Sequence, residues 1–213
     1  MKNARIMIGA ILAGTVVSAV CATTNGIGSL VQVGTGVQAE LQSGKVAPKV
    51  TAAKKKAAYK GNAEFVKGFL DEDEWKYEME DKDDRVIFTG GIGLDGPYNS
   101  CQFILMVDDD LVQTYTILPA SAKTKKAEIA EFITRANYGN KYGGFEMDYS
   151  DGEIRYHMTL PIEAIRADRD KFVKLILVLP AKIMDKYAKG IAAVLLGIKT
   201  PETAVEECEA DDE

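Results

Sequence analysis

The segment Gly143–Leu160, GGFEMDYSDGEIRYHMTL, decides the fold because it predicts a single β-hairpin. Asp151-Gly152 is the expected turn, since both central positions of a type I′ turn require φ > 0, which Asp and Gly tolerate. Counting outward from this turn gives the predicted cross-strand pairs. These are Ser150–Glu153, Tyr149–Ile154, Asp148–Arg155, Met147–Tyr156, Glu146–His157 and Phe145–Met158.

The predicted hairpin has one apolar and one polar face. The apolar face comprises Phe145, Met147, Tyr149, Ile154, Tyr156, Met158 and Leu160. The polar face comprises Glu146, Asp148, Arg155, His157 and Thr159. Alternation with a period of two indicates a sheet with one buried and one solvated face. The single histidine of the chain is thereby explained as a surface residue without catalysis.

The composition is that of one globular domain with an extension, because 46% of the 213 residues are hydrophobic and 27% are charged. The net charge of −6 argues against nucleic acid as a partner, since phosphate binding requires a basic face. Acidic residues crowd the C-terminus, and residues 208–213 are expected to form a solvated acidic tail.

The cysteine pattern argues against a structural zinc site. The three cysteines, Cys21, Cys101 and Cys208, form no CxxC or Cys/His spacing. Cys101 lies in an apolar strand pattern and is expected in the core. Cys208 is expected to be free in the tail, and a Cys101–Cys208 disulfide in an oxidising compartment is left open.

The first 22 residues have the layout of an export signal or membrane anchor. A short basic start precedes the uncharged run Ile6–Val20, and small residues allow cleavage after Ala19 or Ala22. Alternatively, residues 6–24 stay as an anchor, because this run just reaches the ~20 residues that span a bilayer. Either interpretation places the rest of the chain outside the cytoplasm. Lipidation at Cys21 and a buried helix of a cytoplasmic protein are the remaining alternatives.

Residues 23–61 are predicted to be a linker rich in glycine and lysine. Glycines at positions 26, 28, 34, 36 and 44 disfavour a stable helix. Lys54-Lys55-Lys56 is interpreted as a solvated charge run, with contact to anionic lipid or an acidic partner as the alternative. Gly26-x-Gly28 is not followed by a nucleotide-binding fingerprint, so no cofactor is predicted.

Residues 62–207 are predicted to form an α+β domain with two layers, an antiparallel sheet and helices on one of its faces. The expected elements are a short helix capped by Asn62, strands at 75–79, 85–94, 101–107 and 111–118, a helix at 122–137, the hairpin, and a long final helix. Thr124, Asp168 and Thr200 are expected helix caps. Pro119 is expected to end its strand, and Pro180 to kink or divide the final helix.

Three consecutive aspartates, Asp108–Asp110, suggest calcium, but they occupy a tight connection between strands. A calcium loop of the EF-hand type requires acidic residues at alternate positions, a central glycine and a distant Glu. We therefore predict no metal site.

Both faces of strand 101–107 carry apolar side chains. Cys101, Phe103, Leu105 and Val107 share one face, and Ile104 and Met106 share the other. One face can meet the helices, so the second requires another cover. A second protomer, a client peptide, or residues 25–61 folded back would each provide it.

One catalytic alternative is a hydrolase that uses Glu146 and His157. These residues are predicted neighbours across the hairpin, so the carboxylate could orient the imidazole. They lie on the solvated face, and no GxSxG motif or other nucleophile motif accompanies them. Cross-strand acid–base pairs also stabilise surfaces, so no catalytic residue is predicted.

Short signals in a fixed order resemble the YbjN-like family of bacterial proteins. They include Asn137, Gly144-Phe145, the Asp151-Gly152 turn, Ile154-Arg155-Tyr156, Met184–Tyr187 and the segment LLGIKTPETAVEE at 195–207. The resemblance covers residues 62–207. It implies a fold similar to type III secretion chaperones, which are dimers that hold extended partner segments.

The resemblance also implies a regulator of sensory transduction with no known catalytic residues. We therefore expect a non-enzymatic protein-binding or regulatory module, acting as a homodimer with an unidentified protein partner. The export-like start adds an extracytoplasmic location in the cell envelope, and a membrane-anchored scaffold is the alternative role.

Overall fold

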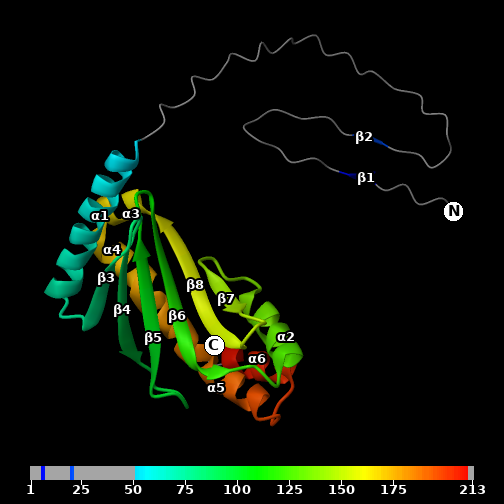
Figure 1. Ribbon diagram of the computed structural model, residues 1–213. Helices are drawn as coiled ribbons and strands as arrows, with labels where there is room; N and C mark the ends of the chain where they lie inside the picture. Colours follow the sequence, from blue (N-terminus) through cyan, green and yellow to red (C-terminus); the bar gives the residue numbers. More distant parts are fainter. Residues whose placement is uncertain (1–5, 8–19, 22–50, 211–213) are drawn as a thin grey trace. The chain divides into compact units, whose positions relative to one another are not determined.

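The computed structural model describes residues 6–7, 20–21 and 51–210, and the chain divides into two units, residues 1–47 and 48–213 (Figure 1). In the first unit, strand β1 (Ile6–Met7) pairs antiparallel with β2 (Val20–Cys21). Most of the expected export signal and of the expected linker therefore lies outside the described residues. All other described elements belong to the second unit.

A six-stranded antiparallel sheet forms one layer of this second unit, in the order β3-β4-β5-β6-β8-β7 (Figure 1). Its strands are β3 (Tyr77–Asp81), β4 (Val86–Gly93), β5 (Ser100–Val107), β6 (Leu111–Ser121), β7 (Gly144–Met147) and β8 (Glu153–Pro161). The predicted α+β class is confirmed.

The helices form the second layer, on one face of the sheet. They are α1 (Ala52–Glu72), α2 (Lys126–Asn137), α3 (Ile162–Ala167), α4 (Arg169–Val173), the π-helix η1 (Lys174–Val178), α5 (Leu179–Leu195) and α6 (Pro201–Ala210). Helix α3 follows β8 directly and was not predicted.

The core lies between the two layers. In β5 the predicted inward row of Cys101, Phe103, Leu105 and Val107 is 3% exposed or less. One cluster joins this sheet face to α1, α4 and η1, and a second joins it to α2, α5 and α6. The alternation that the sequence predicts for β5 is confirmed.

The hairpin β7–β8 exists, but its predicted register is wrong by two residues. Phe145 pairs with Tyr156 and Glu146 pairs with Arg155. The turn is longer than predicted because the Gly152 N–H donates to the carbonyl of Asp148, and only Gly152 has a positive φ, of 82°. A two-residue shift leaves each side chain on its predicted face. The exception is Tyr149, which lies in the turn and is 60% exposed.

The first helix begins eleven residues earlier than predicted, and Asn62 is not its cap. Thr51 caps α1, so residues 52–61 of the expected linker are helical. Asn62 lies inside the helix and is buried. Its Nδ2 donates to the carbonyls of Asp108 and Asp109, at 3.0 and 3.2 Å, and its Oδ1 accepts from Arg166. The role of Asn62 is therefore to make long-range hydrogen bonds and not to cap a helix locally.

The predicted end of the strand at 111–118 and the predicted start of the helix at 122–137 are also wrong. Strand β6 continues past Pro119 to Ser121, with a register shift relative to β8 after Ile117. An irregular ladder accommodates the missing N–H of a proline. Helix α2 begins at Lys126, and no side chain caps it, so Thr124 is not a cap.

The C-terminal elements agree more closely with the prediction. Asp168 caps α4, because its Oδ1 accepts from the N–H of Lys171 at 3.0 Å. The π-helix η1 ends two residues before Pro180, where the proline would otherwise interrupt regular α-helical bonding. Thr200 accepts from the N–H of Thr203, at the start of α6.

Candidate functional site

The face of the sheet opposite the helices is the candidate site, because no helix of residues 51–210 covers it (Figure 1). Strands β4, β5 and β6 place five apolar side chains on this open face, all of them half-buried. They are Ile87, Ile104, Met106, Tyr115 and Ile117. The register places Ile87 opposite Met106 and Ile104 opposite Tyr115. The five residues, here called the apolar strip, are thus neighbours across three central strands.

A chain of polar contacts borders the apolar strip on β7 and β8. Glu146 Oε1 lies 2.8 Å from His157 Nδ1, so the predicted acid–base pair is present, although the shifted register makes it diagonal. His157 Nε2 lies 3.0 Å from the Oγ1 of Thr159. Carboxylate, imidazole and hydroxyl therefore stand in series.

Arg155 completes this border, and Tyr115 of the apolar strip contacts it. Arg155 Nε donates to Glu146 Oε2 at 2.9 Å, so the predicted Asp148–Arg155 pair is replaced by Glu146–Arg155. The Tyr115 ring stacks on His157 with centroids 4.6 Å apart, and the Arg155 guanidinium lies 4.5 Å from the Tyr115 centroid. These contacts hold His157 against the sheet and join the polar border to the apolar strip.

The electrostatics of Glu146 result from opposing effects. Partial burial raises the pKa of its carboxyl, but hydrogen bonds from His157 and Arg155 outweigh this, so the net pKa is lowered from its usual value. Glu146 therefore stays ionised and orients the imidazole. This arrangement can transfer a proton to or from Thr159, and it can equally serve as a cross-strand surface network.

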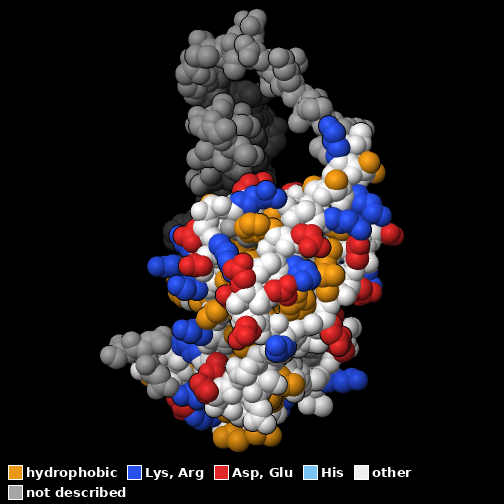
Figure 2. Space-filling model, turned by 90° about the vertical axis from the view of Figure 1, so that its left-hand side faces the viewer, with side chains coloured by type: hydrophobic (Ala, Val, Ile, Leu, Met, Phe, Trp, Pro, Cys, Tyr) orange, Lys and Arg blue, Asp and Glu red, His pale blue; other side chains and the backbone are white. Residues whose placement is uncertain are grey.

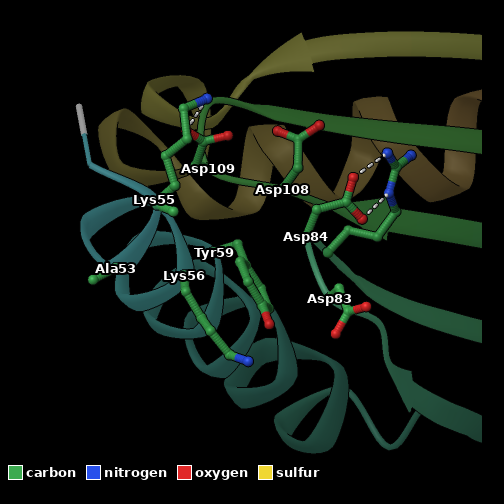
Figure 3. A pocket seen from close by; sticks show the side chains of 10 residues that line it. Ala53, Lys55, Lys56, Tyr59, Asp83, Asp84, Asp108 and Asp109 are labelled. Atoms are coloured by element: carbon green, nitrogen blue, oxygen red, sulfur yellow. Dashed lines mark hydrogen bonds and ion pairs between the residues drawn. The ribbon is translucent and has the colours of Figure 1, made fainter. Parts of the chain in front are cut away.

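A cavity of about 440 Å³ lies at the N-terminal end of α1 (Figure 3). Two ion pairs line it, Lys55–Asp109 at 3.0 Å and Arg85–Asp84 at 2.8 Å. Tyr59 also lines it and donates its hydroxyl hydrogen to Asp81. Since four of the charged groups that line the cavity form ion pairs with each other, the cavity is not lined by charges of a single sign.

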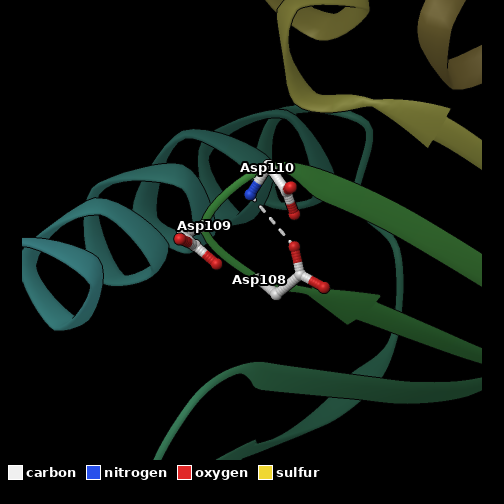
Figure 4. A group of neighbouring side chains, drawn as sticks. All are labelled: Asp108, Asp109 and Asp110. Carbon is white, nitrogen blue, oxygen red and sulfur yellow. Dashed lines mark hydrogen bonds between the residues drawn. The ribbon is translucent and has the colours of Figure 1, made fainter. Parts of the chain in front are cut away.

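Three consecutive aspartates form the β5–β6 connection (Figure 4), and two of them, Asp108 and Asp109, line this cavity. One carboxylate oxygen from each lies within 4.8 Å of the others. Asp108 Oδ1 accepts the backbone N–H groups of Asp110 and Leu111, and Asp109 pairs with Lys55. Interaction with the Asp108 carboxylate raises the pKa of Asp110. Turn capping thus accounts for Asp108 and ion pairing for Asp109.

Cys101 and Cys208 are free and buried, and Cys208 belongs to α6 instead of a solvated tail. Burial raises the pKa of the Cys101 thiol to about 11 and also raises that of Cys208. Neither thiol is poised as a nucleophile, because nucleophilic cysteines require a lowered pKa.

The exposed surface carries mixed charge. Figure 2 shows the side on which α1 and β3 lie, where basic and acidic side chains intermingle with apolar groups between them. Lys54, Lys55 and Lys56 follow Ala52 and Ala53 near the start of α1, and Lys55 is neutralised by Asp109. Within the described parts of the chain, no helix combines the length and apolarity that a membrane span requires.

The fold and the open face define a small α+β protein built around an antiparallel sheet, with a surface free for contact. The family model "YbjN: Putative bacterial sensory transduction regulator" matches residues 62–176, more than half of the chain. The chain belongs to the YbjN family. Searches of curated proteins and of solved structures each found no match. The family match ends in η1, so helices α5 and α6 lie beyond it.

The alternation of the sequence placed Glu146, Arg155, His157 and Thr159 on one polar face, but it paired Arg155 with Asp148 and did not bring Tyr115 to His157. Thr159 lies two residues after His157 on the same strand, so period-2 spacing was the available signal. Tyr115 and Arg155 meet His157 and Glu146 only through the β6–β8 pairing and the shifted hairpin register.

Proposed function

We propose that this YbjN protein is a non-enzymatic regulatory module that binds protein through its open sheet face, with a second copy of the chain as its partner. The supporting observation is the apolar strip, which is only partly buried because every helix of residues 51–210 packs on the opposite face. Burying a fully exposed side chain of this size contributes about 1.5–3 kcal/mol, and covering these partly buried side chains would contribute the fraction that corresponds to their remaining exposed area. Five adjacent side chains thus favour association over continued exposure.

The polar border supports the same role. Arg155 is a residue type enriched in protein interfaces, and its guanidinium lies over the ring of Tyr115, which belongs to the apolar strip. Because Glu146 already orients Arg155 and His157, the border is pre-organised for contact. The chaperone-like holding of extended segments, which the family resemblance implies, is part of this proposal.

Sedimentation equilibrium of the full chain at tens of micromolar tests the proposal. We expect a dimer for the wild type and a monomer for Ile104→Lys, because a lysine would have to be buried at the interface. Ile198→Lys is the matched control, since Ile198 is 67% exposed after α5 and far along the chain from the apolar strip. A wild-type monomer, or an Ile104→Lys dimer, would contradict the proposal.

We further propose that the protein works in the bacterial cell envelope, exported or anchored by residues 6–24. The support is the basic start and uncharged run of the sequence. Cell fractionation tests it. Recovery in the periplasm, or in membranes with release by detergent, agrees with the proposal, whereas a soluble cytoplasmic protein that keeps Met1 contradicts it. Release only by detergent would favour the alternative role of a membrane-anchored scaffold.

A second candidate function is acid–base hydrolysis, favoured by the series Glu146–His157–Thr159. The distances of 2.8 and 3.0 Å match those of a carboxylate, base and hydroxyl that act together. Reaction of the purified chain with an activated ester, compared with His157→Ala and Thr159→Val, tests this candidate. Equal rates for the three proteins would exclude it.

A further inference from the structure

We infer that the free edge of strand β3 accepts an extended basic segment of another protein by strand addition. This inference rests on the proposed holding of extended segments and gives it a site, the edge of the sheet, which is a different surface from the open face proposed for the dimer. It rests on the backbone of β3, on its contrast with the opposite edge, and on the side chains that flank it.

The backbone of β3 has outward groups that no described residue satisfies. The N–H of Lys82 donates to the carbonyl of Arg85 at 2.8 Å, and this bond fixes the phase of the β3–β4 ladder. Since hydrogen-bonded pairs alternate in an antiparallel ladder, the N–H and C=O groups of Tyr77, Met79 and Asp81 point away from β4. Within residues 51–210 these groups have no hydrogen-bond partner. Such a row is a template for another strand.

The opposite edge of the sheet is blocked at Phe145. In β7, Phe145 and Met147 point their backbone groups outward, because Asp148 donates to the carbonyl of Glu153. Asn137 engages Phe145 twice: its Nδ2 donates to the Phe145 carbonyl at 2.9 Å, and its Oδ1 accepts from the Phe145 N–H at 2.7 Å. An amide side chain thus takes the place that an added strand would need. The two edges are unequal, and β3 is the one left open.

The charge around β3 selects the partner. Residues 71–84 contain nine Asp or Glu and two Lys, a net charge of −7 against −6 for the whole chain. Lys60 neutralises Asp81 and Lys82 contacts Glu80, whereas Glu78 has no ion pair among the described residues. An added strand with Lys or Arg facing Glu78 and Glu80 would gain cross-strand opposite-charge pairs.

The other side of the edge carries Met79 between Tyr77 and Asp81, and Asp81 is already paired with Lys60. Met79 lies between Glu78 and Glu80 on the strand, points to the opposite face and is 49% exposed. A partner strand that alternates basic and apolar residues therefore matches both faces of the edge. This alternation distinguishes strand addition from general attraction of a polycation.

Fluorescence anisotropy with a labelled eight-residue peptide of alternating lysine and valine tests the inference on the full chain. We expect saturable binding at physiological salt. Binding should be lost when alternate backbone amides of the peptide are N-methylated, since methylation removes its ladder donors without changing its charge. A glutamate–valine peptide should not bind.

Variants of β3 separate backbone pairing from electrostatics. Met79→Pro removes an outward N–H, which an edge strand tolerates, and should weaken binding about tenfold. Met79→Ala is the matched control and should bind within about threefold of the wild type. The double variant Glu78→Lys/Glu80→Lys should prefer the glutamate–valine peptide, which keeps the inference testable if the proline variant fails to fold.

Three results would overturn the inference. They are absence of binding to the wild type, equal binding of the N-methylated peptide, and unchanged binding by a folded Met79→Pro variant. If binding changed with the charge variants but not with N-methylation of the peptide, the peptide would be held by non-specific electrostatic attraction and not by strand addition. Circular dichroism spectra of all variants establish that each is folded.

Discussion

The Asn137 side chain makes two hydrogen bonds with the backbone of Phe145, in the position where a neighbouring strand would make them. The Asn137 carboxamide donates to the carbonyl of Phe145 and accepts from its N–H, at 2.9 and 2.7 Å. Asn137 is also the last residue of α2, so one side chain fastens the end of a helix to the edge strand β7. The predicted helix end at Asn137 is thus a tertiary contact as well as a local one.

Asn137→Ala is expected to destabilise the domain by about 1–3 kcal/mol, because the N–H and C=O of Phe145 lose their partners. Asn137→Asp keeps the acceptor and loses the donor, so an intermediate loss is expected. Urea unfolding monitored by circular dichroism measures both. Stability of Asn137→Ala equal to that of the wild type would show that water replaces the carboxamide at no cost.

Thr116→Val is expected to stabilise the domain by about 1 kcal/mol. Thr116 is 1% exposed on the helix-facing side of β6, and its hydroxyl has no hydrogen-bond partner within the described part of the chain. Valine has the same shape and does not bury an unsatisfied hydroxyl. Thr134→Val serves as the contrast, because the Thr134 hydroxyl donates to the carbonyl of Ala130. A lower unfolding midpoint for Thr116→Val would reveal an ordered water on this hydroxyl.

Cys101 and Cys208 are expected to resist thiol reagents in the native state. Burial raises the pKa of Cys101 to about 11 and also that of Cys208, so little thiolate forms at pH 8. In a Cys21→Ser background, we expect no rapid reaction with a disulfide reagent in buffer and two reactive thiols in urea. Fewer than two thiols in urea without reductant would indicate the Cys101–Cys208 disulfide instead.

Glu146 is expected to make stability depend on acid pH. Its pKa is lowered in the folded state by His157 and Arg155, against the effect of burial. Its contribution is therefore present above the unfolded-state pKa and is lost as the pH falls through the folded-state pKa. Because the side chain is 41% exposed, we expect Glu146→Gln to cost less than about 1 kcal/mol at pH 7.

The cost of Glu146→Gln should shrink towards zero as the pH is lowered to about 3. Urea unfolding at a series of pH values measures this trend, with Glu64→Gln as the control because Glu64 is exposed on α1. A cost that stays constant from neutral to acid pH would show that Glu146 acts through its shape and not its charge.

The sequence predicted the sheet faces well because alternation reports burial directly. Phe103 and Leu105 are fully buried and Ile104 is half-buried between them, as their spacing indicates. Even the wrong hairpin register kept these faces, since it was wrong by an even number of residues. Register depends on the turn, and the sequence did not show that Asp148 and Gly152 would close a longer loop.

Long-range polar contacts could not be predicted from the sequence. Asn62 fits the pattern of a helix cap, but its amide instead satisfies the β5–β6 connection. Likewise, the polar partners of His157 depend on how β8 pairs with β6 and β7. Local chemistry predicted the pair Glu146–His157, whereas the whole border of the open face required the tertiary structure.

Site-specific photo-crosslinking tests the central claim, that a second copy covers the open face, most directly. A benzophenone side chain at position 104 lies within the apolar strip, and the same group at position 198 lies on an exposed loop. The purified full chain at tens of micromolar is illuminated, and covalent dimers are measured. We predict efficient dimer formation from position 104 and little from position 198. Equal yields from the two positions, or no dimer from position 104, would contradict the account.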